Sequence, residues 1–227
     1  LQSMMILTFD AGSNLMETLG RTDLKQKYAD VATRLRKHIP TGNTTKQAGA
    51  MMVLAGLADA KNVNREILKK DGVQNMSTFY GYYLLEAMAK AGDHQGALKV
   101  IREYWGGMLD LGATTFWEDF DINDSRNATP ITELTPAGKA DIHGDYRHSF
   151  CHGWASGPTA WLSQHVLGIT LMEGGDAVKI TPHLGNLEYA KGTYPTKHGL
   201  ISVTHFRKTD GTVESLVSLP GGLKRIK

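Results

Sequence analysis

A change in the spacing of apolar residues constrains the fold of this chain more than any other feature. Through most of the first 168 positions apolar residues recur every three or four residues, whereas from Val178 onward they alternate every second residue. The first spacing is typical of amphipathic helices and the second of half-buried strands. We therefore expect a mostly α chain with a C-terminal all-β module, divided into a helical part over 1–170 and a β part over 171–227.

The N-terminal segment is predicted to form a helical hairpin. Its second helix is marked by one apolar stripe, which consists of Leu24, Tyr28, Val31, Leu35 and Ile39. Thr22 is the expected N-cap of this helix, and Pro40 lies beyond its end. The helix before it, over 1–19, ends at Gly20, a residue typical of helix C-termini. A link this short places the two helices antiparallel.

Further helices are predicted up to residue 110. One covers 47–57, a charged stretch at 61–70 is a short surface helix or a loop, and Ser77 caps the next helix, which Gly92 and Asp93 end. The apolar positions of the later helices are Tyr82, Leu85, Met88, Ala89, Leu98, Ile101, Trp105 and Met108. Trp105, and Trp161 further along, have the spacing of core residues, so we expect them to serve in packing.

The C-terminal third begins with one more helix, which ends at Gly168. The run Ser156-Gly157-Pro158 is consistent either with the start of this helix or with a kink in a longer helix from Ser149. The predicted strands are 178–181, 187–191, 200–206 and 213–219. Asp210-Gly211 between the last two is a strong hairpin signal, because both residues tolerate positive φ.

Charge and composition exclude several classes of partner. The net charge is +2 with 21% charged residues, and no long run of Lys or Arg is present, which argues against nucleic acid and against an anionic membrane surface. No apolar stretch approaches the roughly 20 residues that cross a bilayer. The single cysteine, Cys151, cannot form an internal disulfide, and the glycine pairs do not form a phosphate-binding loop, so we predict no nucleotide cofactor.

Two segments carry the residue types that sugar chemistry needs. Hydrolysis of a glycosidic bond generally uses two carboxyl groups, with aromatic faces to hold the ring. The candidates are Phe116, Trp117, Glu118, Asp119 and Asp121 in one segment, and His143, Asp145, Arg147, His148, His152 and Trp154 in the other. Glu118 is either an ordinary surface acid or a partly buried catalytic carboxylate, and the adjacent Trp117 with the small residues at 112–113 favours the second interpretation. Asp119 and Asp121 are expected to form ion pairs or to cap the loop.

The histidines and the cysteine have simpler interpretations. His143, His148 and His152 are spaced by five and four residues and lack a metal-binding motif, so we predict no metal site and expect His152 to bind substrate hydroxyls. Cys151 stands beside His152, yet neighbours on a helix rarely face one another. A buried thiol is therefore the expected state of Cys151.

Three ordered motifs resemble a known family. They are GATTFWEDFD, then RHSFCHGWASGPTAWLSQHVLGI, then VKITPHLGNLEYAKGTYPTKHGLISV. The upstream segment STFYGYYLLEAMAKAGDHQGALKVIREYWGGML also fits. Together they resemble the C-terminal part of bacterial α-L-rhamnosidases of glycoside hydrolase family 78. The resemblance implies part of an (α/α)6 toroid, the six-hairpin glycosidase fold, followed by a small antiparallel β-sandwich.

The same resemblance implies a reaction and a set of residues. The reaction is the inverting hydrolysis of terminal α-L-rhamnosides, without a cofactor. Glu118, in the Thr-x-Trp-Glu motif at 115–118, is the implied general base. Trp117 would wall the sugar subsite and His152 would contact the sugar, with Phe116 and Trp154 as further substrate-binding residues.

One departure from the family pattern shapes the remaining expectations. The family's general acid lies upstream of the matching region, so we expect the chain to be a C-terminal fragment that is inactive alone, with helix faces exposed for dimerisation or other association. The resemblance favours an exported enzyme. Two alternatives stay open: a six-hairpin glycosidase for another sugar, and a non-catalytic carbohydrate-binding or scaffolding protein.

Overall fold

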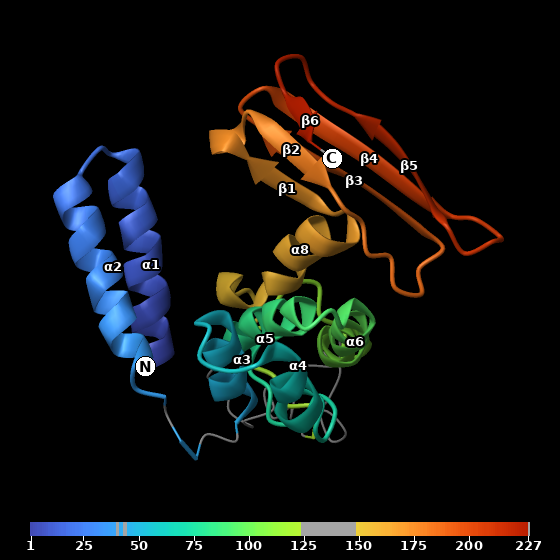
Figure 1. Cartoon of the computed structure of the whole chain (residues 1–227). Coiled ribbons are helices and arrows are strands. Elements are labelled where there is room, and N and C mark those ends of the chain that lie inside the picture. Colours follow the sequence, from blue (N-terminus) through green and yellow to red (C-terminus); the bar gives the residue numbers. More distant parts are fainter. Residues whose placement is uncertain (40, 43–44, 124–148, 227) are drawn as a thin grey trace.

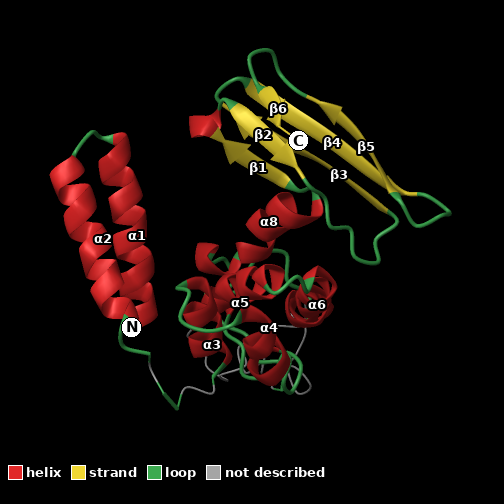
Figure 2. Ribbon diagram, viewed as in Figure 1, coloured by secondary structure: helices red, strands yellow, loops and turns green. Residues whose placement is uncertain are grey.

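The computed structural model describes residues 1–39, 41–42, 45–123 and 149–226. Helices make up the N-terminal part of the described chain and strands the C-terminal part, as Figure 2 shows. The fold class predicted from the apolar spacing is therefore confirmed. Among the described residues, no helix has both the length and the apolar character that a membrane crossing requires.

Two antiparallel helices open the chain and stand beside the other helices (Figure 1). They are α1 (Gln2–Thr18) and α2 (Thr22–Arg36). Gly20, with φ +69°, makes the turn between them, as a residue without Cβ can at little cost. The predicted cap at Thr22 is wrong: Arg21 occupies the cap position, and Thr22 is the first helical residue.

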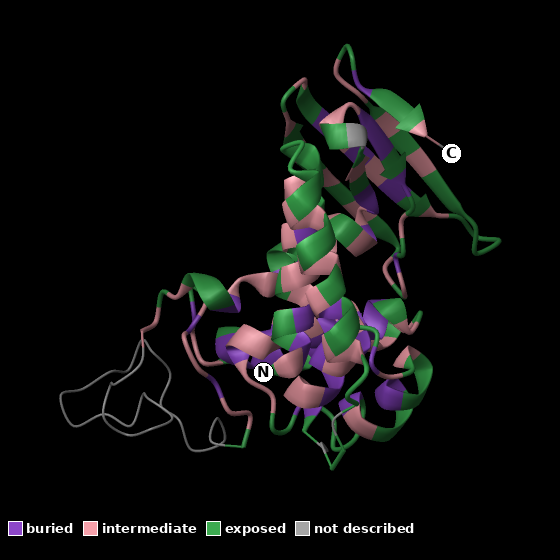
Figure 3. Cartoon of the chain, turned by 60° about the vertical axis from the view of Figure 1, so that its left-hand side comes forward, coloured by how far each residue is buried: buried purple, intermediate pink, exposed green. Residues whose placement is uncertain are grey.

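The hairpin is fixed to the rest of the molecule by a small apolar cluster. Ile6 of α1 is fully buried there against Ala55 and Leu57. The guanidinium group of Arg36 binds the Asp10 carboxylate, and its Nε donates to the Ala55 carbonyl oxygen at 3.3 Å. Elsewhere the hairpin is mostly exposed, as the pink and green ribbon in Figure 3 indicates.

A cluster of short helices forms the main core. Its elements are α3 (Lys46–Leu54), α4 (Ala60–Val63), η1 (Asn64–Leu68), α5 (Thr78–Lys90), α6 (His94–Val100), η2 (Ile101–Trp105) and α7 (Gly106–Asp110). The charged stretch predicted as a short surface helix or a loop is helical, as α4 and η1, over most of its length. Ser77 and Asp93 cap α5 and α6 through side-chain oxygens that accept backbone N–H bonds, which satisfies donors that a helix start leaves unpaired.

Helix α5 lies at the centre of this core. Leu85 is completely buried, and Gly81 leaves room for the ring of Trp105, which would be 2.6 Å from a Cβ at that position. The indole N–H of Trp105 donates to the Ala155 carbonyl at 2.8 Å, and that of Trp161 donates to the Leu85 carbonyl at 3.1 Å. The packing role predicted for the two tryptophans is confirmed.

The segment after residue 149 returns to this core. It contains η5 (Gly153–Ala155), α8 (Gly157–Trp161) and η6 (Leu162–Val166). Helix α8 starts at Gly157 with Pro158 in its first turn, so the first of the two interpretations of Ser156-Gly157-Pro158 is correct. Gly168, with φ +69°, ends the helical part. Only glycine fits there, because a Cβ would lie 2.3 Å from the Thr181 carbonyl carbon.

Two three-stranded sheets follow. The strands are β1 (Ile169–Met172), β2 (Ala177–Ile180), β3 (Tyr189–Thr196), β4 (Gly199–Arg207), β5 (Val213–Ser218) and β6 (Lys224–Ile226), with η7 (Glu173–Gly175) between the first two. The sheet orders are β1-β2-β6 and β3-β4-β5. Residues of both sheets share one buried cluster, which includes Val178 and Val203, so the sheets form a sandwich.

The predicted strands correspond to four of the observed six. The turn at Asp210-Gly211 is confirmed, with φ +84° at the glycine. Strands β1 and β6 were not predicted, because four and three residues are too few to show an alternation. One pairing also departs from the antiparallel expectation, since β2 and β6 run parallel with Val178 opposite Arg225.

Candidate active site

Glu118 lies in an irregular segment after α7 that runs alongside the chain at 149–152. The backbone N–H of Glu118 donates to the Ser149 carbonyl at 2.8 Å, and the N–H of His152 donates to the Phe116 carbonyl at 2.8 Å. The Thr115 hydroxyl also donates to the Phe150 carbonyl. The structure therefore brings together the described parts of the two candidate segments, whereas His143, Asp145, Arg147 and His148 lie outside the described residues.

The Glu118 carboxylate is held on one side and partly open to solvent. Its Oε2 accepts the backbone N–H of Ser149 at 2.8 Å, and Nδ1 of His152 lies 3.7 Å from the same oxygen. The two side chains are 30% and 31% exposed. This combination of a directed hydrogen bond, a neighbouring imidazole and remaining solvent access suits a carboxylate that acts on a water molecule or a hydroxyl group.

The backbone carbonyl of Glu118 is bound by two side chains. The indole Nε1–H of Trp154 donates to it at 2.7 Å, and the hydroxyl group of Thr78 donates to the same oxygen. Thr78 begins α5 and is 1% exposed, whereas Trp154 belongs to η5 and is 46% exposed. Glu118 is thus connected to the buried start of α5 and to an exposed aromatic ring.

Aromatic rings continue from Trp154 along the start of α5. The Trp154 ring lies 4.0 Å from the His152 ring and 5.8 Å from the Phe79 ring, measured between centroids. Phe79 in turn contacts Tyr80 and Tyr83 edge-on. The sequence interpretation missed this surface: four aromatic residues within 79–83 were the available signal, and only Tyr82 was noted, as part of a helix stripe.

Trp117 does not have the position expected of a sugar-binding wall. Its side chain is 2% exposed and packs in the core, with the Phe150 ring at 5.3 Å and the Phe120 ring at 6.1 Å. Its indole nitrogen is buried and has no hydrogen-bond partner within the described part of the chain. Phe116 is half-buried and lines a separate apolar hollow of about 190 Å³ beside Trp105.

The two aspartates after Glu118 shape the loop. The Asp119 carboxylate accepts the N–H of Phe120 at 2.9 Å, and the Asp121 carboxylate accepts the N–H of Asn123 at 2.8 Å, in agreement with the capping role expected of them. Tyr104 donates its hydroxyl to the Phe120 carbonyl at 2.5 Å. Burial raises the pKa of Tyr104, and the negative charges of Asp119 and Asp121 raise it further.

Cys151 is exposed, so the prediction of a buried thiol is wrong. The error has a conformational cause: the segment 149–152 is not helical, and it turns Cys151 outward between the half-buried Phe150 and His152. Within the described ranges no group of three or more His, Cys, Asp or Glu side chains has the arrangement of a metal site. His143 and His148, two of the three histidines for which we predict no metal site, lie outside those ranges.

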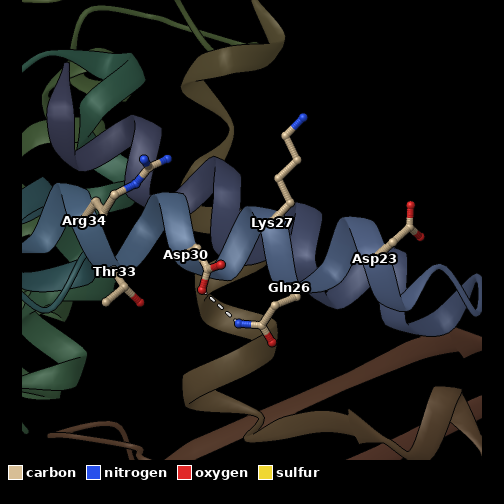
Figure 4. A pocket seen from close by; sticks show the side chains of 6 residues that line it. All are labelled: Asp23, Gln26, Lys27, Asp30, Thr33 and Arg34. Carbon is tan, nitrogen blue, oxygen red and sulfur yellow. Dashed lines mark hydrogen bonds between the residues drawn. The ribbon is translucent and has the colours of Figure 1, made fainter.

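One hollow among the described residues lies on the N-terminal hairpin and away from Glu118. It has a volume of about 610 Å³, and all its lining residues belong to α2: Asp23, Gln26, Lys27, Asp30, Thr33 and Arg34. Figure 4 shows these side chains spread along the helix, with Gln26 bonded to Asp30 at 2.8 Å. A hollow bounded by one helix is a solvated surface, and it shares no residue with the surroundings of Glu118.

One family model and several solved structures match this chain. The family model described as the bacterial alpha-L-rhamnosidase 6 hairpin glycosidase domain matches residues 4–166. No curated protein matches the chain. Among solved structures, a GH78 family rhamnosidase of Bacillus sp. GL1 has 21% identity and a TM-score of 0.79, with 97% of this chain and 25% of that chain covered.

Two further structures have the same fold. A native α-L-rhamnosidase from Aspergillus terreus has 17% identity and a TM-score of 0.79, with 97% of this chain and 27% of that chain covered. An α-L-rhamnosidase from Dictyoglumus thermophilum has 18% identity and a TM-score of 0.74, with 94% and 25% covered. The chain thus spans about a quarter of the length of each of these proteins.

Proposed function

The chain belongs to the family of bacterial α-L-rhamnosidases with a six-hairpin glycosidase domain, and from this premise we propose that it provides Glu118 as the general base for inverting hydrolysis of terminal α-L-rhamnosides. In such a reaction a carboxylate removes a proton from water as the water attacks the anomeric carbon. An acid on the other side of the sugar protonates the leaving oxygen. We assign no residue of this chain to the acid.

The hydrogen bonding of the Glu118 carboxylate carries the proposal. Oε2 is bonded to the Ser149 N–H at 2.8 Å, while the side chain keeps 30% of its surface exposed. A carboxylate with one oxygen oriented by the backbone and with solvent access can direct a lone pair at a bound water molecule. The neighbouring imidazole of His152, 3.7 Å away, adds a donor for the water or for a sugar hydroxyl.

The exposed rings next to Glu118 support a carbohydrate as the substrate. Trp154 offers an exposed indole beside His152, and the apolar face of a sugar packs well on such a ring. We propose His152 and Trp154 as substrate-binding residues. The burial of Trp117 and the separate hollow beside Phe116 favour supporting roles for these two residues, in which they pack behind the segment that carries Glu118.

A substrate that needs no general acid tests the base directly. Fluoride leaves without protonation, so α-L-rhamnosyl fluoride requires only the base and the bound water. Without a general acid the chain is expected to be inactive on ordinary glycosides, but we expect it to release fluoride from this substrate, with β-L-rhamnose as the first product in proton NMR spectra. Glu118→Gln keeps the shape of the side chain but removes the base, and it should lower the rate at least about 100-fold.

Three outcomes would contradict the proposal. Undiminished turnover by Glu118→Gln would remove Glu118 from the mechanism, and α-L-rhamnose as the first product would exclude inversion. Absence of fluoride release would contradict catalysis by this chain. A panel of other glycosyl fluorides, assayed with the same variant, separates the rhamnoside from the hydrolysis of another sugar.

A further inference from the structure

We infer that Thr78 and Trp154 are positioning residues, which hold the general base by its main chain: both donate a hydrogen bond to the backbone carbonyl of Glu118. The inference rests on the role proposed for Glu118. Neither residue needs to touch the reacting atoms to act in this way, although Trp154 also faces the solvent.

Thr78 connects Glu118 to helix α5 in the main core. Its hydroxyl group lies at the first residue of α5, 1% exposed, and reaches a carbonyl 40 residues further along the chain. The cap of α5 is a different residue, because the Ser77 hydroxyl oxygen accepts the N–H of Tyr80. The hydroxyl of Thr78 is therefore not required for the start of the helix, and its described bond is the one to Glu118.

Trp154 reaches the same oxygen from a different element. Its Nε1–H donates to the Glu118 carbonyl at 2.7 Å, and its ring contacts the rings of His152 and Phe79. Displacement of this ring would break a bond to the backbone of Glu118. Trp154 thus couples the exposed aromatic surface to the position of the carboxylate.

Together these bonds fix Glu118 at three places. Its N–H is bonded to the Ser149 carbonyl, its carboxylate to the Ser149 N–H, and its carbonyl to Thr78 and Trp154. Glu118 belongs to no helix or strand, so side chains take the place of the regular backbone bonds that would otherwise hold it. A general base needs this restraint, because a misplacement of about 1 Å can reduce a rate about 100-fold.

Substitution of Thr78 separates positioning from folding. Thr78→Val keeps the shape of the side chain and removes the donor, so we expect kcat for α-L-rhamnosyl fluoride to fall about tenfold or more while KM changes little. Thr78→Ser restores the donor and should restore kcat. Trp154→Phe removes the indole N–H, and it should lower kcat and also raise KM, because the exposed ring becomes smaller.

Ser77→Ala is the matched control. It removes the cap of α5 next to Thr78 but no bond to Glu118, so it should lower the melting temperature and leave kcat near that of the wild-type protein. Equal losses of kcat in Ser77→Ala and Thr78→Val would overturn the inference, since destabilised helix α5 would explain both. Wild-type kcat in Thr78→Val would overturn it as well.

A second measurement does not depend on turnover and so distinguishes failure of this inference from failure of the proposed function. The backbone N–H of Ser149 is bonded to the Glu118 carboxylate at 2.8 Å, so we expect this bond to slow its hydrogen exchange. We expect Thr78→Val to increase the exchange rate of this N–H about tenfold and Ser77→Ala to leave it unchanged. Unchanged exchange in Thr78→Val would refute the positioning role even if Glu118 proves essential.

Discussion

Acid should weaken the junction between the helices and the sandwich through one stacked pair of histidines. The rings of His94, at the start of α6, and His183, between β2 and β3, are stacked with centroids 3.7 Å apart and planes 11° apart. The ring of His165 lies 5.5 Å from that of His94 and is bonded to Glu86 at 3.0 Å. A proton on His94 would place a positive charge against two imidazoles in a half-buried site.

The direction and size of the effect follow from the pKa of His94. This pKa is lowered from 6.5 to about 4, first by burial and then by the nearby His183 and His165, while the Gly92 carbonyl and Asp93 oppose the change. Because the folded protein binds the proton less readily than the unfolded chain, the stability is complete above pH 6.5 and is lost as the pH falls toward 4. With a pKa of 6.5 in the unfolded chain and about 4 in the folded protein, protonation of His94 lowers the free energy of unfolding at pH 5 by about 2 kcal/mol.

Solvent screening reduces that value, since His94 is only half-buried and His183 is the exposed member of the stack. We therefore expect the free energy of unfolding to fall by about 1 kcal/mol at pH 5, which corresponds to a decrease of about 2–4 °C in the melting temperature for a chain of this length. The assay is urea unfolding at pH 8 and pH 5 for the wild-type protein and for His94→Gln, which cannot be charged. The variant should lose about 1 kcal/mol less than the wild-type protein between the two pH values.

The exposed His38 provides the control, because His38→Gln should leave the pH dependence of the wild-type protein unchanged. Equal losses of stability in His94→Gln and the wild-type protein would refute the reasoning. Such a result would mean that the other titrating groups, such as the fully buried His205, determine the acid sensitivity.

Two further predictions concern packing and association. Gly81→Ala places a methyl group 2.6 Å from the Trp105 ring, and it should lower the free energy of unfolding measured by chemical denaturation by about 1–3 kcal/mol. Gly106→Ala is the control, because its methyl group meets no atom within 4 Å and should not lower this free energy. Helix α1 exposes apolar side chains, with Met5 40% and Leu15 55% exposed, and we expect concentration-dependent association that Leu15→Glu weakens. Light scattering that shows monomers at every wild-type concentration would contradict the second prediction.

Much of the local structure could be predicted, because it depends on interactions between near neighbours. The break at Gly92-Asp93, the cap at Ser77 and the turn at Asp210-Gly211 all use bonds or dihedral angles within a few residues. The predictions failed for a very short strand and for an irregular segment that was expected to be helical. Strand β6 was missed, and Cys151 was placed on a helix that the segment does not form.

At the candidate site, too, some features could be predicted from the sequence and others could not. Glu118 could be selected as a candidate because residue types and motifs are properties of the sequence. Which tryptophan would face solvent could not be read from it: Trp117 is 2% exposed and Trp154 46%, although both stand in aromatic, loop-like segments. That difference arises from the backbone pairing of the two segments, which turns Trp117 toward the core and leaves Trp154 at the surface.

The sequence by itself determined the change from helices to strands, four of the six strands, the resemblance to a family and the candidate base. These depend on periodicity, turn residues and motifs, which are properties of the sequence. Only the tertiary structure decided what surrounds that base. Thr78 and Trp154 bind one carbonyl although they are separated from it by 40 and 36 residues, and His94 meets His183 across two parts of the fold. Contacts at such separations arise when the whole core packs, and no local pattern encodes them.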